Sequence, residues 1–479
     1  MEPLKNTGHW PVWRVFLAAS RKTPWMTHQL RCTTTQATAQ ASTRFVALKR
    51  DDVTTSEQTS RSNRDQSPGV EPEIPDTRTP IQRFRTKPKK PLSVTDIVSP
   101  AWCELQYWYN LTKYGRVKRT PAMKQGSGVH KVLEDQVHTH VPVEVITNED
   151  GFGLRIWNII QGLRTLRSTG LTRELEVWGL VDGEIVNGVI DAVTTECPDE
   201  EAEAFVLEQQ KQDAQKNVKH KPLPSGQRTL TDFVTSAPTS LILERVDAGL
   251  LGTLQPKLRT IYVFDIKTRQ SKTLPSAPSQ LKPVQMQLML YHRFFSALAS
   301  DQVPASAVFR RYGVAPDEQF SDTFLAQLGM LEIHGSQNSF TDPEDDDIGP
   351  PSPLRDPMDE ILAHNTLSSL WRLLVSEFAS AAPFGAISPL LTAEYRTPTD
   401  GALMGRRSFA FNAQQLDQYV ADEMKWWKGE RPVKGVEIEE AFKCRICEFA
   451  PTCQWRIDRA EEGIKKARSK QQKRKKSEI

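Results

Sequence analysis

Two aspartates and one lysine have the side-chain chemistry that phosphodiester hydrolysis needs. Asp265 and Lys267 lie two residues apart in a β-rich run, residues 260–267, so a strand there would place both side chains on one face. Asp191 ends another such run, residues 185–191. The two carboxylates could hold Mg²⁺ or Mn²⁺, which prefer oxygen ligands. Lys267 could then orient the attacking water or stabilise the charge of the transition state.

Two predicted helices carry further polar groups near this pair of strands. His130 and Glu134 lie four residues apart in residues 126–137 and therefore share one helix face, where they could add a metal ligand and an outer contact. Gln287 and Tyr291 have the same spacing in residues 283–298. An Asp-x-Lys triplet alone occurs by chance, so the interpretation depends on the order of these four pieces along the chain.

Four cysteines lie on either side of this segment. Cys103 precedes it, and Cys444, Cys447 and Cys453 follow it with Cys-x2-Cys-x5-Cys spacing. Six cysteines in 479 residues are too few for a disulfide framework, and their clustering favours metal ligation in a reducing compartment. Four thiolates accept either Zn²⁺ or an iron–sulfur cluster, and spacing alone does not separate the two. Cys32 and Cys197 are interpreted as incidental.

Basic side chains near these groups are candidates for contacts to DNA phosphates. The predicted contacts are Arg116, Lys118, Arg119, Arg269 and Lys272. Aromatic rings that could stack on bases lie near Arg116, Lys118 and Arg119 in the sequence. For each ring, packing in the core is the alternative. These rings are Tyr107, Trp108, Tyr109 and Tyr114. The net charge of +3 does not by itself indicate a polyanion ligand, so the prediction depends on local charge.

The elements that must position these residues alternate between strands and helices. Strands are predicted at residues 175–180, 185–191, 260–267, 390–396 and 408–412, and the first two form a predicted hairpin that turns at Asp182-Gly183. Helices are predicted at residues 126–137, 153–168, 283–298, 356–380 and 414–427, with a capped helix start at Ser93. This alternation predicts an α/β fold.

Composition divides the chain into segments. Residues 1–45 are predicted to be a mitochondrial transit peptide, because they are basic, rich in Ser and Thr and almost free of acidic residues, with a basic tail as the alternative. Residues 46–90 are predicted to be a disordered linker, and residues 91–458 a single domain with insertions at 197–258 and 335–355. Residues 459–479 form a basic tail, either solvated or attracted to phosphate. No apolar run approaches the roughly 20 residues that cross a bilayer.

The order of these pieces resembles the PD-(D/E)xK superfamily, and more closely its RecB-like nucleases. The matching residues are Gly128-Val129-His130-x3-Glu134, Gly188-Val189-Ile190-Asp191, Asp265-Ile266-Lys267 and Gln287-x3-Tyr291. Gln285 also precedes Tyr291 but lacks the spacing. One cysteine before this core and Cys-x2-Cys-x5-Cys after it resemble the exonuclease V family, whose fungal members are mitochondrial. The resemblance spans roughly residues 91–455 without the insertions.

The resemblance implies a restriction-endonuclease-like α/β core, with a central mixed sheet flanked by helices and closed by a four-cysteine 4Fe-4S site. It implies a monomeric exonuclease that uses Mg²⁺ (or Mn²⁺) to degrade single-stranded DNA from an end into short oligonucleotides, in maintenance of mitochondrial DNA. The matrix is the expected location, a single-strand-binding protein is a candidate partner, and no membrane partner is expected. The implied catalytic residues are Asp191, Asp265, Lys267, Glu134, His130, Gln287 and Tyr291, with Asp191 and Asp265 as Mg²⁺ ligands.

Two other functions fit the same residues. One is a non-catalytic module that binds single-stranded nucleic acid and contains a structural zinc site. The other is the nuclease subunit of a helicase–nuclease, whose motor would be another chain because no Gly-x4-Gly-Lys-[Ser/Thr] motif is present. Gln227-x2-Leu230-x2-Phe233-Val234 approximates the peptide that docks on sliding clamps but lacks its second aromatic residue. The motif is interpreted either as a chance match or as a sign of an additional nuclear pool.

Overall fold

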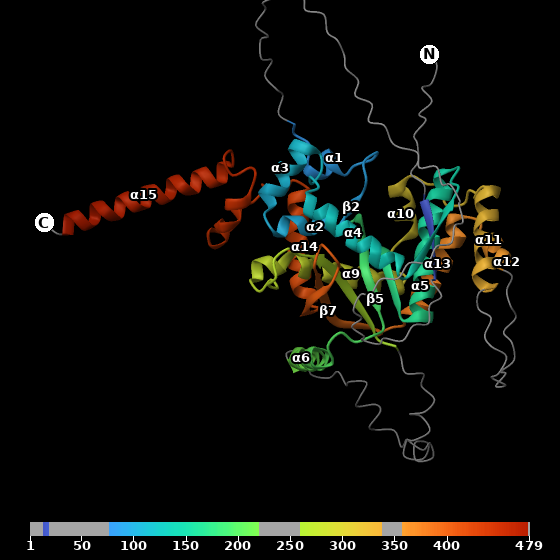
Figure 1. Ribbon diagram of the computed structural model, residues 1–479. Helices are drawn as coiled ribbons and strands as arrows, with labels where there is room; N and C mark the ends of the chain where they lie inside the picture. Colours follow the sequence, from blue (N-terminus) through green and yellow to red (C-terminus); the bar gives the residue numbers. More distant parts are fainter. Residues whose placement is uncertain (1–12, 19–75, 220–258, 338–356, 478–479) are drawn as a thin grey trace, which may run out of the picture. The chain divides into compact units, whose positions relative to one another are not determined.

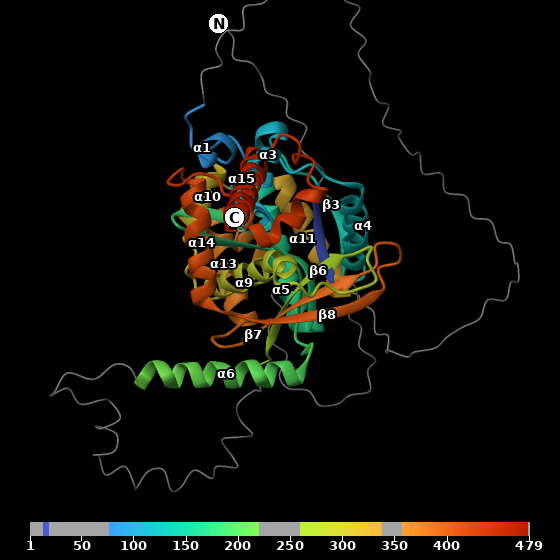
Figure 2. The same ribbon diagram turned by 90° about the vertical axis from the view of Figure 1, so that its left-hand side faces the viewer.

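A mixed, six-stranded sheet carries the candidate residues (Figures 1 and 2). Its strands are β2 (Leu92–Ser93), β4 (Leu171–Val181), β5 (Glu184–Thr194), β6 (Ile261–Thr268), β7 (Ile387–Arg396) and β8 (Leu403–Ala410). The order is β2-β5-β6-β7-β8, and β4 also pairs with β5. β2–β5 and β6–β7 are parallel, whereas β4–β5, β5–β6 and β7–β8 are antiparallel. The predicted α/β class with a central mixed sheet is therefore confirmed.

The computed structural model describes residues 13–18, 76–219, 259–337 and 357–477. It divides into two units, one made of Met1–Ala19 with Thr79–Ile479 and the other of Ser20–Arg78. All elements named here belong to the first unit. The sequence that approximates a clamp-binding peptide at Gln227, most of the predicted transit peptide and the larger part of both predicted insertions lie outside the described residues.

The hairpin that carries Asp191 forms as predicted. β4 and β5 are joined by Asp182 and Gly183, whose φ angles of 48° and 83° are both positive, as a type I′ turn requires. Glycine adopts such angles at little cost, and aspartate tolerates them better than most residues. The two-residue turn pairs Val181 with Glu184 and thereby fixes the register of the whole hairpin.

Helices pack against the sheet and hold the site between them. α5 (Asn148–Thr169) and α9 (Pro278–Ala299) both contact β4, and α13 (Leu367–Ala381) contacts both helices. α4 (Pro121–Asp135) contacts β4, β6 and the short strand β3 (His138–Val143). α6 (Glu200–Lys219), green in Figure 2, lies next to β7. None of the helices in the described ranges is long and apolar enough to cross a membrane.

The remaining elements connect and cover these layers. They are β1 (Trp13–Ala18), α1 (Pro80–Phe84), α2 (Val94–Val98), η1 (Ser99–Ala101), α3 (Glu104–Tyr114), α10 (Ala305–Tyr312), α11 (Asp322–Gln337), α12 (Pro357–Ala363), α14 (Ala413–Trp427), η4 (Ile438–Ile446) and α15 (Gln454–Ser477). β1, which falls within the predicted transit peptide, pairs antiparallel with β3. The predicted cap at Ser93 is confirmed, because its hydroxyl accepts from Asp96 N and Asp96 accepts from Ser93 N.

The main hydrophobic core contains α5, α9 and the β4–β5 hairpin. Trp157, Trp178 and Phe294 are among its largest fully buried side chains. Phe294 of α9 packs directly on the backbone of β4, because a Cβ at Gly179 would lie 2.0 Å from its ring. Burial of one such side chain stabilises the fold by about 2–3 kcal/mol. This core fixes β4, β5 and α9, which carry Glu174, Asp191, Gln287 and Tyr291.

Several boundaries differ from the sequence predictions. The helix α1 lies within the segment predicted as a linker, where it buries Pro80 and Phe84, and a five-residue helix is too short for its periodicity to show. The first predicted insertion contains α6, and the single helix predicted at residues 356–380 is two, α12 and α13. The basic C-terminal segment is helical, as α15.

Candidate active site

The two predicted aspartates lie where strands β5 and β6 separate. The ladder between these strands runs only through Ala192, Val193 and Thr194 of β5. One residue earlier, the side chain of Asp191 replaces the backbone pairing, since Asp191 Oδ2 accepts a 2.6 Å hydrogen bond from Ile266 N. The separation therefore opens a space at the sheet edge into which side chains from β5 and β6 can point, without leaving the Ile266 N–H unsatisfied.

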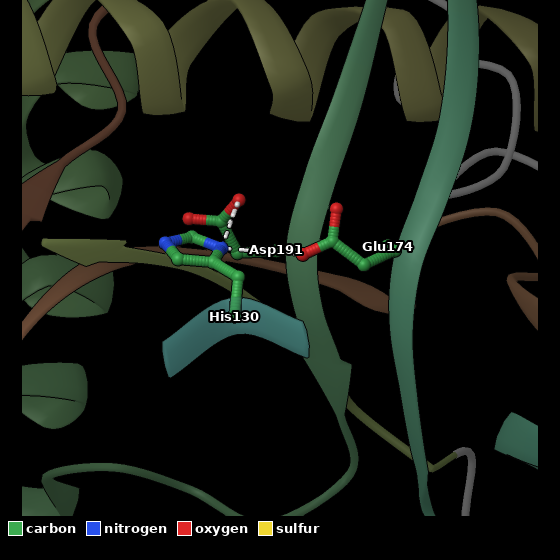
Figure 3. A group of neighbouring side chains, drawn as sticks. All are labelled: His130, Glu174 and Asp191. Carbon is green, nitrogen blue, oxygen red and sulfur yellow. Dashed lines mark hydrogen bonds and ion pairs between the residues drawn. The ribbon is translucent and has the colours of Figure 1, made fainter. Parts of the chain in front are cut away.

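His130 of α4 closes this space from above the sheet. Its Nε2 lies 3.1 Å from Ile266 O, and its Nδ1 lies 3.2 Å from Glu174 Oε1 and 3.5 Å from Asp191 Oδ1. The three ligand atoms of His130, Glu174 and Asp191 all lie within 4.8 Å of one another (Figure 3). α4 approaches closely because Gly126 has no side chain, and a Cβ there would lie 2.7 Å from Thr268 Oγ1. The arrangement could hold one metal ion.

Glu174 was not among the residues that the sequence predicted, although the hairpin register contained the signal. With Val181 paired to Glu184, counting back along both strands places Glu174 opposite Asp191. Side chains of directly opposed residues point to the same face of a sheet. Glu174 also has a φ of +50°, unusual for a residue other than glycine and costing on the order of 1–3 kcal/mol. Such strain persists only where surrounding contacts hold the residue in place, and strained residues are common at functional sites.

Asp265 and Lys267 project from β6 toward α9. Lys267 Nζ lies 2.9 Å from both carboxylate oxygens of Asp265 and donates a 3.1 Å hydrogen bond to Gln287 Oε1. Gln287 Nε2 in turn donates to Tyr291 Oη at 2.9 Å. Tyr291 reaches this position because Gly188 of β5 leaves room: a Cβ there would lie 2.7 Å from the Tyr291 ring. The predicted Gln-x3-Tyr pair thus fixes the lysine, whereas Gln285 contacts Gln415 instead.

The electrostatics of the site show a surplus of negative charge. Burial raises the pKa of Asp191 well above its usual range, and the neighbouring Asp265 raises it further. Burial would lower the pKa of His130, but Glu174 and Asp191 outweigh it and leave that pKa raised. The pKa of Lys267 is also raised, because Asp265 and Asp191 outweigh the effect of burial. A cation placed among these carboxylates would relieve their repulsion.

The donor set fits a divalent cation on a second ground. Asp265 is fully buried, and Lys267 Nζ, 2.9 Å from its Oδ2, is paired with that oxygen although no hydrogen bond to it is formed within the described residues. Two buried carboxylates, Asp191 and Asp265, face this single ammonium group, and a divalent cation would compensate the remaining negative charge. Carboxylates with one imidazole are ligands that Mg²⁺ and Mn²⁺ accept. The nearby residues therefore fit a Mg²⁺ or Mn²⁺ ion held by Asp191 and Asp265, as predicted, together with His130 and Glu174.

Glu134 lies at the groove but outside the group of three ligands. It shares the face of α4 with His130, but its Oε1 lies 3.7 Å from His140 Nε2, and it is not among the three grouped ligands. It does line the same groove. This active-site groove lies between α4 and the strand ends, and its walls include His130, Glu134, Glu174, Asp191, Ile266, Lys267 and Thr268.

The predicted DNA-binding residues divide into two groups. Arg119 lines the active-site groove and donates to Ser127 Oγ, while Arg116 and Lys118 are exposed on the preceding loop. Arg269 and Lys272 follow β6, and the buried Arg269 Nε has no hydrogen-bond partner within the described residues. Of the aromatic rings, Tyr107 is a core residue that donates to Asp96 Oδ1, whereas Tyr114 lies beside Lys113 and Lys118 on the surface side.

The four predicted cysteines are brought together at a second site. Cys103, Cys444, Cys447 and Cys453 line one cavity, together with Trp102, Tyr109 and Trp455. Cys103 is the N-cap of α3, and its sulfur accepts from Gln106 N. Burial raises the pKa of the Cys103 thiol to about 11, and the other three cysteines raise it as well. Across the described residues, no three of these sulfur atoms lie within 4.8 Å of one another.

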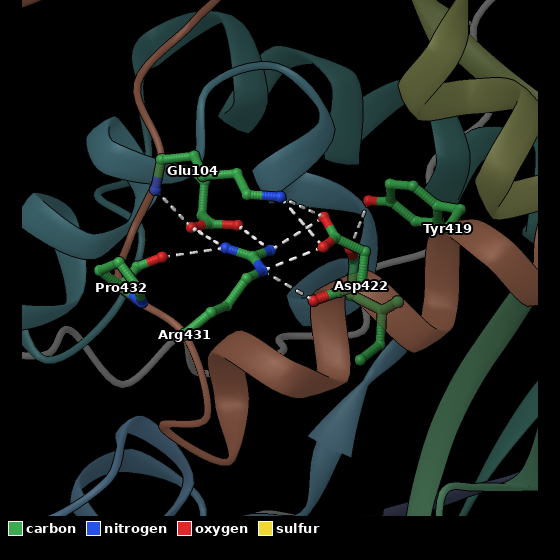
Figure 4. A network of polar contacts seen from close by, with 7 residues as sticks. Glu104, Tyr419, Asp422, Arg431 and Pro432 are labelled. Atoms are coloured by element: carbon green, nitrogen blue, oxygen red, sulfur yellow. Dashed lines mark hydrogen bonds and ion pairs between the residues drawn. The ribbon is translucent and has the colours of Figure 1, made fainter.

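A clamp of charged residues fixes the two halves of the cysteine site (Figure 4). Arg431 donates to both carboxylate oxygens of Glu104 at 2.8 and 2.6 Å, and to Asp422. Lys434 N donates to Glu104 Oε1 at 2.7 Å, and Leu105 N donates to Lys434 O. Glu104 directly follows Cys103, so the start of α3 is tied to the segment that leads to Cys444 without any contribution from the thiols.

These features define a metal-dependent phosphodiester hydrolase that acts on DNA. The chain belongs to the exonuclease V family: the family model described as "Exonuclease V - a 5' deoxyribonuclease" matches residues 79–456. It is 24% identical to a Danio rerio protein named Exonuclease V, over 80% of this chain and 73% of the relative. Proteins named "Exonuclease V, mitochondrial" are similar at 23% identity in Eremothecium gossypii, over 76% of both chains, and at 21% in Komagataella phaffii, over 81% of both chains.

Family membership settles one of the alternatives. A non-catalytic binding module is not the function of this chain, since the family is one of deoxyribonucleases.

Proposed function

We propose that this protein is an exonuclease that degrades single-stranded DNA with bound Mg²⁺ and acts on mitochondrial DNA. The observation that carries the proposal is the convergence of His130, Glu174 and Asp191 beside the Asp265–Lys267 pair in one groove. Family membership fixes the substrate class as DNA. The specific preference for single strands, the short oligonucleotide products and the role in mitochondrial DNA maintenance come from the resemblance.

Four residues would hold the metal ion: Asp191 and Asp265 by their carboxylates, with Glu174 and His130 beside them. When bound, the ion would neutralise negative charge on the phosphoryl oxygens and activate a water molecule. Hydrolysis adds water across one P–O bond, so one strand end receives a phosphate and the other a hydroxyl. Negative charge accumulates on the phosphoryl oxygens during this step. Positive and hydrogen-bond-donating groups that are already fixed around the phosphorus therefore contribute most to stabilising the transition state.

Lys267 is the cation that the chain itself supplies for that step. Asp265 and Gln287 fix its ammonium group from two sides, and Tyr291 fixes Gln287. Lys267 also lines the active-site groove, where its ammonium group can interact with a phosphoryl oxygen or the attacking water. Its raised pKa, due to Asp265 and Asp191, keeps it charged at neutral pH. Gln287 and Tyr291 are therefore positioning residues.

The cysteine site is proposed to hold a 4Fe-4S cluster. Four thiolates accept zinc as well, and the preference for an iron–sulfur cluster comes from the resemblance of the cysteine pattern to that of the exonuclease V family. Its proposed task is structural, because it would add covalent bonds between α3 and the C-terminal segment.

The proposed organisation follows the sequence prediction with one changed boundary. A transit peptide within residues 1–45 would direct the protein to the mitochondrial matrix, in line with relatives whose names include "mitochondrial". The catalytic domain would begin at about Thr79, where the family match starts. The protein is proposed to act as a monomer.

The test is digestion of single-stranded DNA labelled at either end, with Mg²⁺, by the wild type and two variants. Asp265→Asn and Lys267→Met should lose at least about 100-fold in rate. Asp301→Asn and Lys211→Met, both exposed and remote in sequence from the site, are matched controls that should digest DNA as the wild type does. Equal rates for Asp265→Asn and Asp301→Asn would overturn the assigned site. Iron and sulfide content measured on the same samples tests the cluster.

A further inference from the structure

Arginines of the neighbouring strands lie close in register to the β6 residues that line the active-site groove. Ile266 and Thr268 of β6 line the groove, and α4 covers their face of the sheet, since Val129 and Leu133 pack on Ile266. In β7, Glu394 pairs with Ile266 and Arg396 pairs with Thr268. Residues paired in register point to the same face.

The same face carries two more arginines. Arg406 of β8 pairs with Glu394, and its guanidinium lies over the Phe264 ring at 5.8 Å. On the other side, Arg173 of β4 pairs with Ala192, which pairs with Phe264. Arg173 precedes the ligand Glu174. Three arginines thus lie on the α4 face of the sheet, beside the groove.

Glu394 fixes two of these arginines and leaves part of each guanidinium unused. Glu394 is buried, and its two oxygens accept from Arg396 Nε at 2.5 Å and Arg406 Nε at 3.2 Å. Arg396 Nη1 donates to Gly401 O, which leaves Nη2, and neither Nη of Arg406 has a partner among the described residues. A guanidinium has five N–H donors in a planar fork, so each arginine retains donors for an anion.

The third arginine, Arg173, is incompletely paired. The buried Arg173 Nε has no hydrogen-bond partner within the described residues. Clustered, partly desolvated cations of this kind are stabilised when an anion binds between them.

We propose that Arg173, Arg396 and Arg406 form a second phosphate subsite, which binds a phosphodiester group of the DNA strand next to the one that is hydrolysed. The inference rests on the proposed function for its ligand. Arg396 pairs with Thr268, which lines the active-site groove, and adjacent strands of a sheet lie about 4.8 Å apart, so Arg396 is one strand removed from the groove on the α4 face, whereas Lys267 projects from the opposite face. Gly401, which accepts from Arg396, also packs against Val129, the residue before His130. The subsite fixes the register of the strand in the groove, since phosphate contacts position a nucleic acid without reading its sequence.

Arg406→Gln is the main test, because Arg406 is 43% exposed on the edge strand β8 and its loss should leave the fold intact. Binding of fluorescein-labelled oligo-dT is measured by anisotropy in EDTA, where no cleavage occurs, at several salt concentrations. Arg406→Gln and Arg396→Gln are each expected to weaken binding by about 10-fold. Each should also reduce the slope of log K against log salt by about 0.7, the value for one lost contact to a single strand. Arg310→Gln, an exposed arginine on α10, is the matched control and should leave both quantities unchanged.

Two results would overturn the subsite. One is an Arg406→Gln protein that melts like the wild type and binds with unchanged affinity and salt slope. The other is weaker binding with an unchanged salt slope, which would indicate a disturbed fold and no lost phosphate contact. If Arg396→Gln does not fold, Arg406→Gln and Arg173→Gln decide the question. Because binding is measured without cleavage, a wild type that binds DNA but does not cut it would refute the proposed function and leave the subsite standing.

Discussion

His130 Nδ1 lies 3.2 Å from Glu174 Oε1, although the two residues come from different elements, α4 and β4. Glu134, one helical turn from His130, contacts His140 instead. Helical spacing places side chains on one face of a helix, but it does not decide which acid of another element faces them. The carboxylate beside His130 is therefore supplied by the strand that pairs with the Asp191 strand.

Glu174→Gln should lower the rate at saturating DNA by at least about 100-fold and raise the Mg²⁺ concentration needed for half-maximal activity. The reason is that a metal ligand is lost, whereas changes to outer contacts cost about 10–100-fold. Glu134→Gln should have the smaller effect. The measurement is a Mg²⁺ titration of digestion for both variants, and a larger effect of Glu134→Gln would contradict the assignment.

Gln287→Leu should lower kcat by about 10–100-fold with little change in KM, because Lys267 loses the acceptor that fixes its ammonium group. Tyr291→Phe should act in the same direction but less, since it removes only the contact that fixes Gln287. Gln285→Leu is the matched control, because Gln285 lies two residues earlier on the same helix and its side-chain amide donates to Gln415. Steady-state kinetics on end-labelled single strands separate the three, and equal kcat for Gln287→Leu and Gln285→Leu would refute the positioning role.

Much of this site was predictable because its signals are local. The Asp182-Gly183 turn predicted the hairpin, and the Gln-x3-Tyr spacing favoured Gln287 over Gln285 as the partner of Tyr291. The hairpin register also contained Glu174, once the pairs were counted back from the turn. Arg396 and Arg406 could not be found in this way, because the parallel β6–β7 pairing joins segments more than a hundred residues apart and no turn fixes its register.

The elements that the sequence missed are short or lie in atypical composition. α1 has five residues, too few to show a helical period. α6 was concealed by acidic and Gln-rich composition, and it is held mainly from one end: Glu203 accepts from Tyr262 Oη and Ser388 Oγ, both at 2.8 Å. Such contacts come from strands far away in the sequence. Tertiary partners of this kind, and not local propensity, decide whether a polar segment forms a docked helix.

Arg431→Gln should destabilise the protein by about 3–5 kcal/mol, because it leaves Glu104 as an uncompensated charge at 6% side-chain exposure. Lys434→Gln is the control in the same network. Its side chain is 56% exposed and binds only Asp422, so its loss should cost no more than about 1 kcal/mol. Urea unfolding at constant pH measures both changes, and similar values for the two variants would show that the Glu104–Arg431 pair is not the clamp.

Cys103→Ser should abolish metal retention at the cysteine site yet leave α3 attached to the C-terminal segment. The clamp of Glu104 with Arg431 and Lys434, and the bond from Lys443 Nζ to Trp102 O at 2.8 Å, do not involve the thiols. Limited proteolysis should therefore cut residues 431–446 of Cys103→Ser slowly, and those of the double variant Cys103→Ser, Arg431→Gln rapidly. Rapid cleavage in the single variant would mean that the metal group alone holds the two segments together.

His292 should make the protein less stable in mild acid. It stacks on Phe411 with ring centroids 4.2 Å apart, and neither ring nitrogen has a partner among the described residues. Burial, and then Arg293, lower its pKa to about 4, against 6.5 in the unfolded chain. As the pH falls, the unfolded chain therefore binds a proton at a higher pH than the folded protein does. The stabilisation of the folded state by neutral His292 is complete above pH 6.5 and is lost as the pH falls toward 4. At pH 5 the loss is about 2 kcal/mol.

His292→Leu should flatten the dependence of the unfolding free energy on pH between 7.5 and 5 by that amount, whatever its effect on stability at pH 7.5. Urea unfolding at a series of pH values gives the two curves, and parallel curves would show that His292 is not protonated more readily on unfolding.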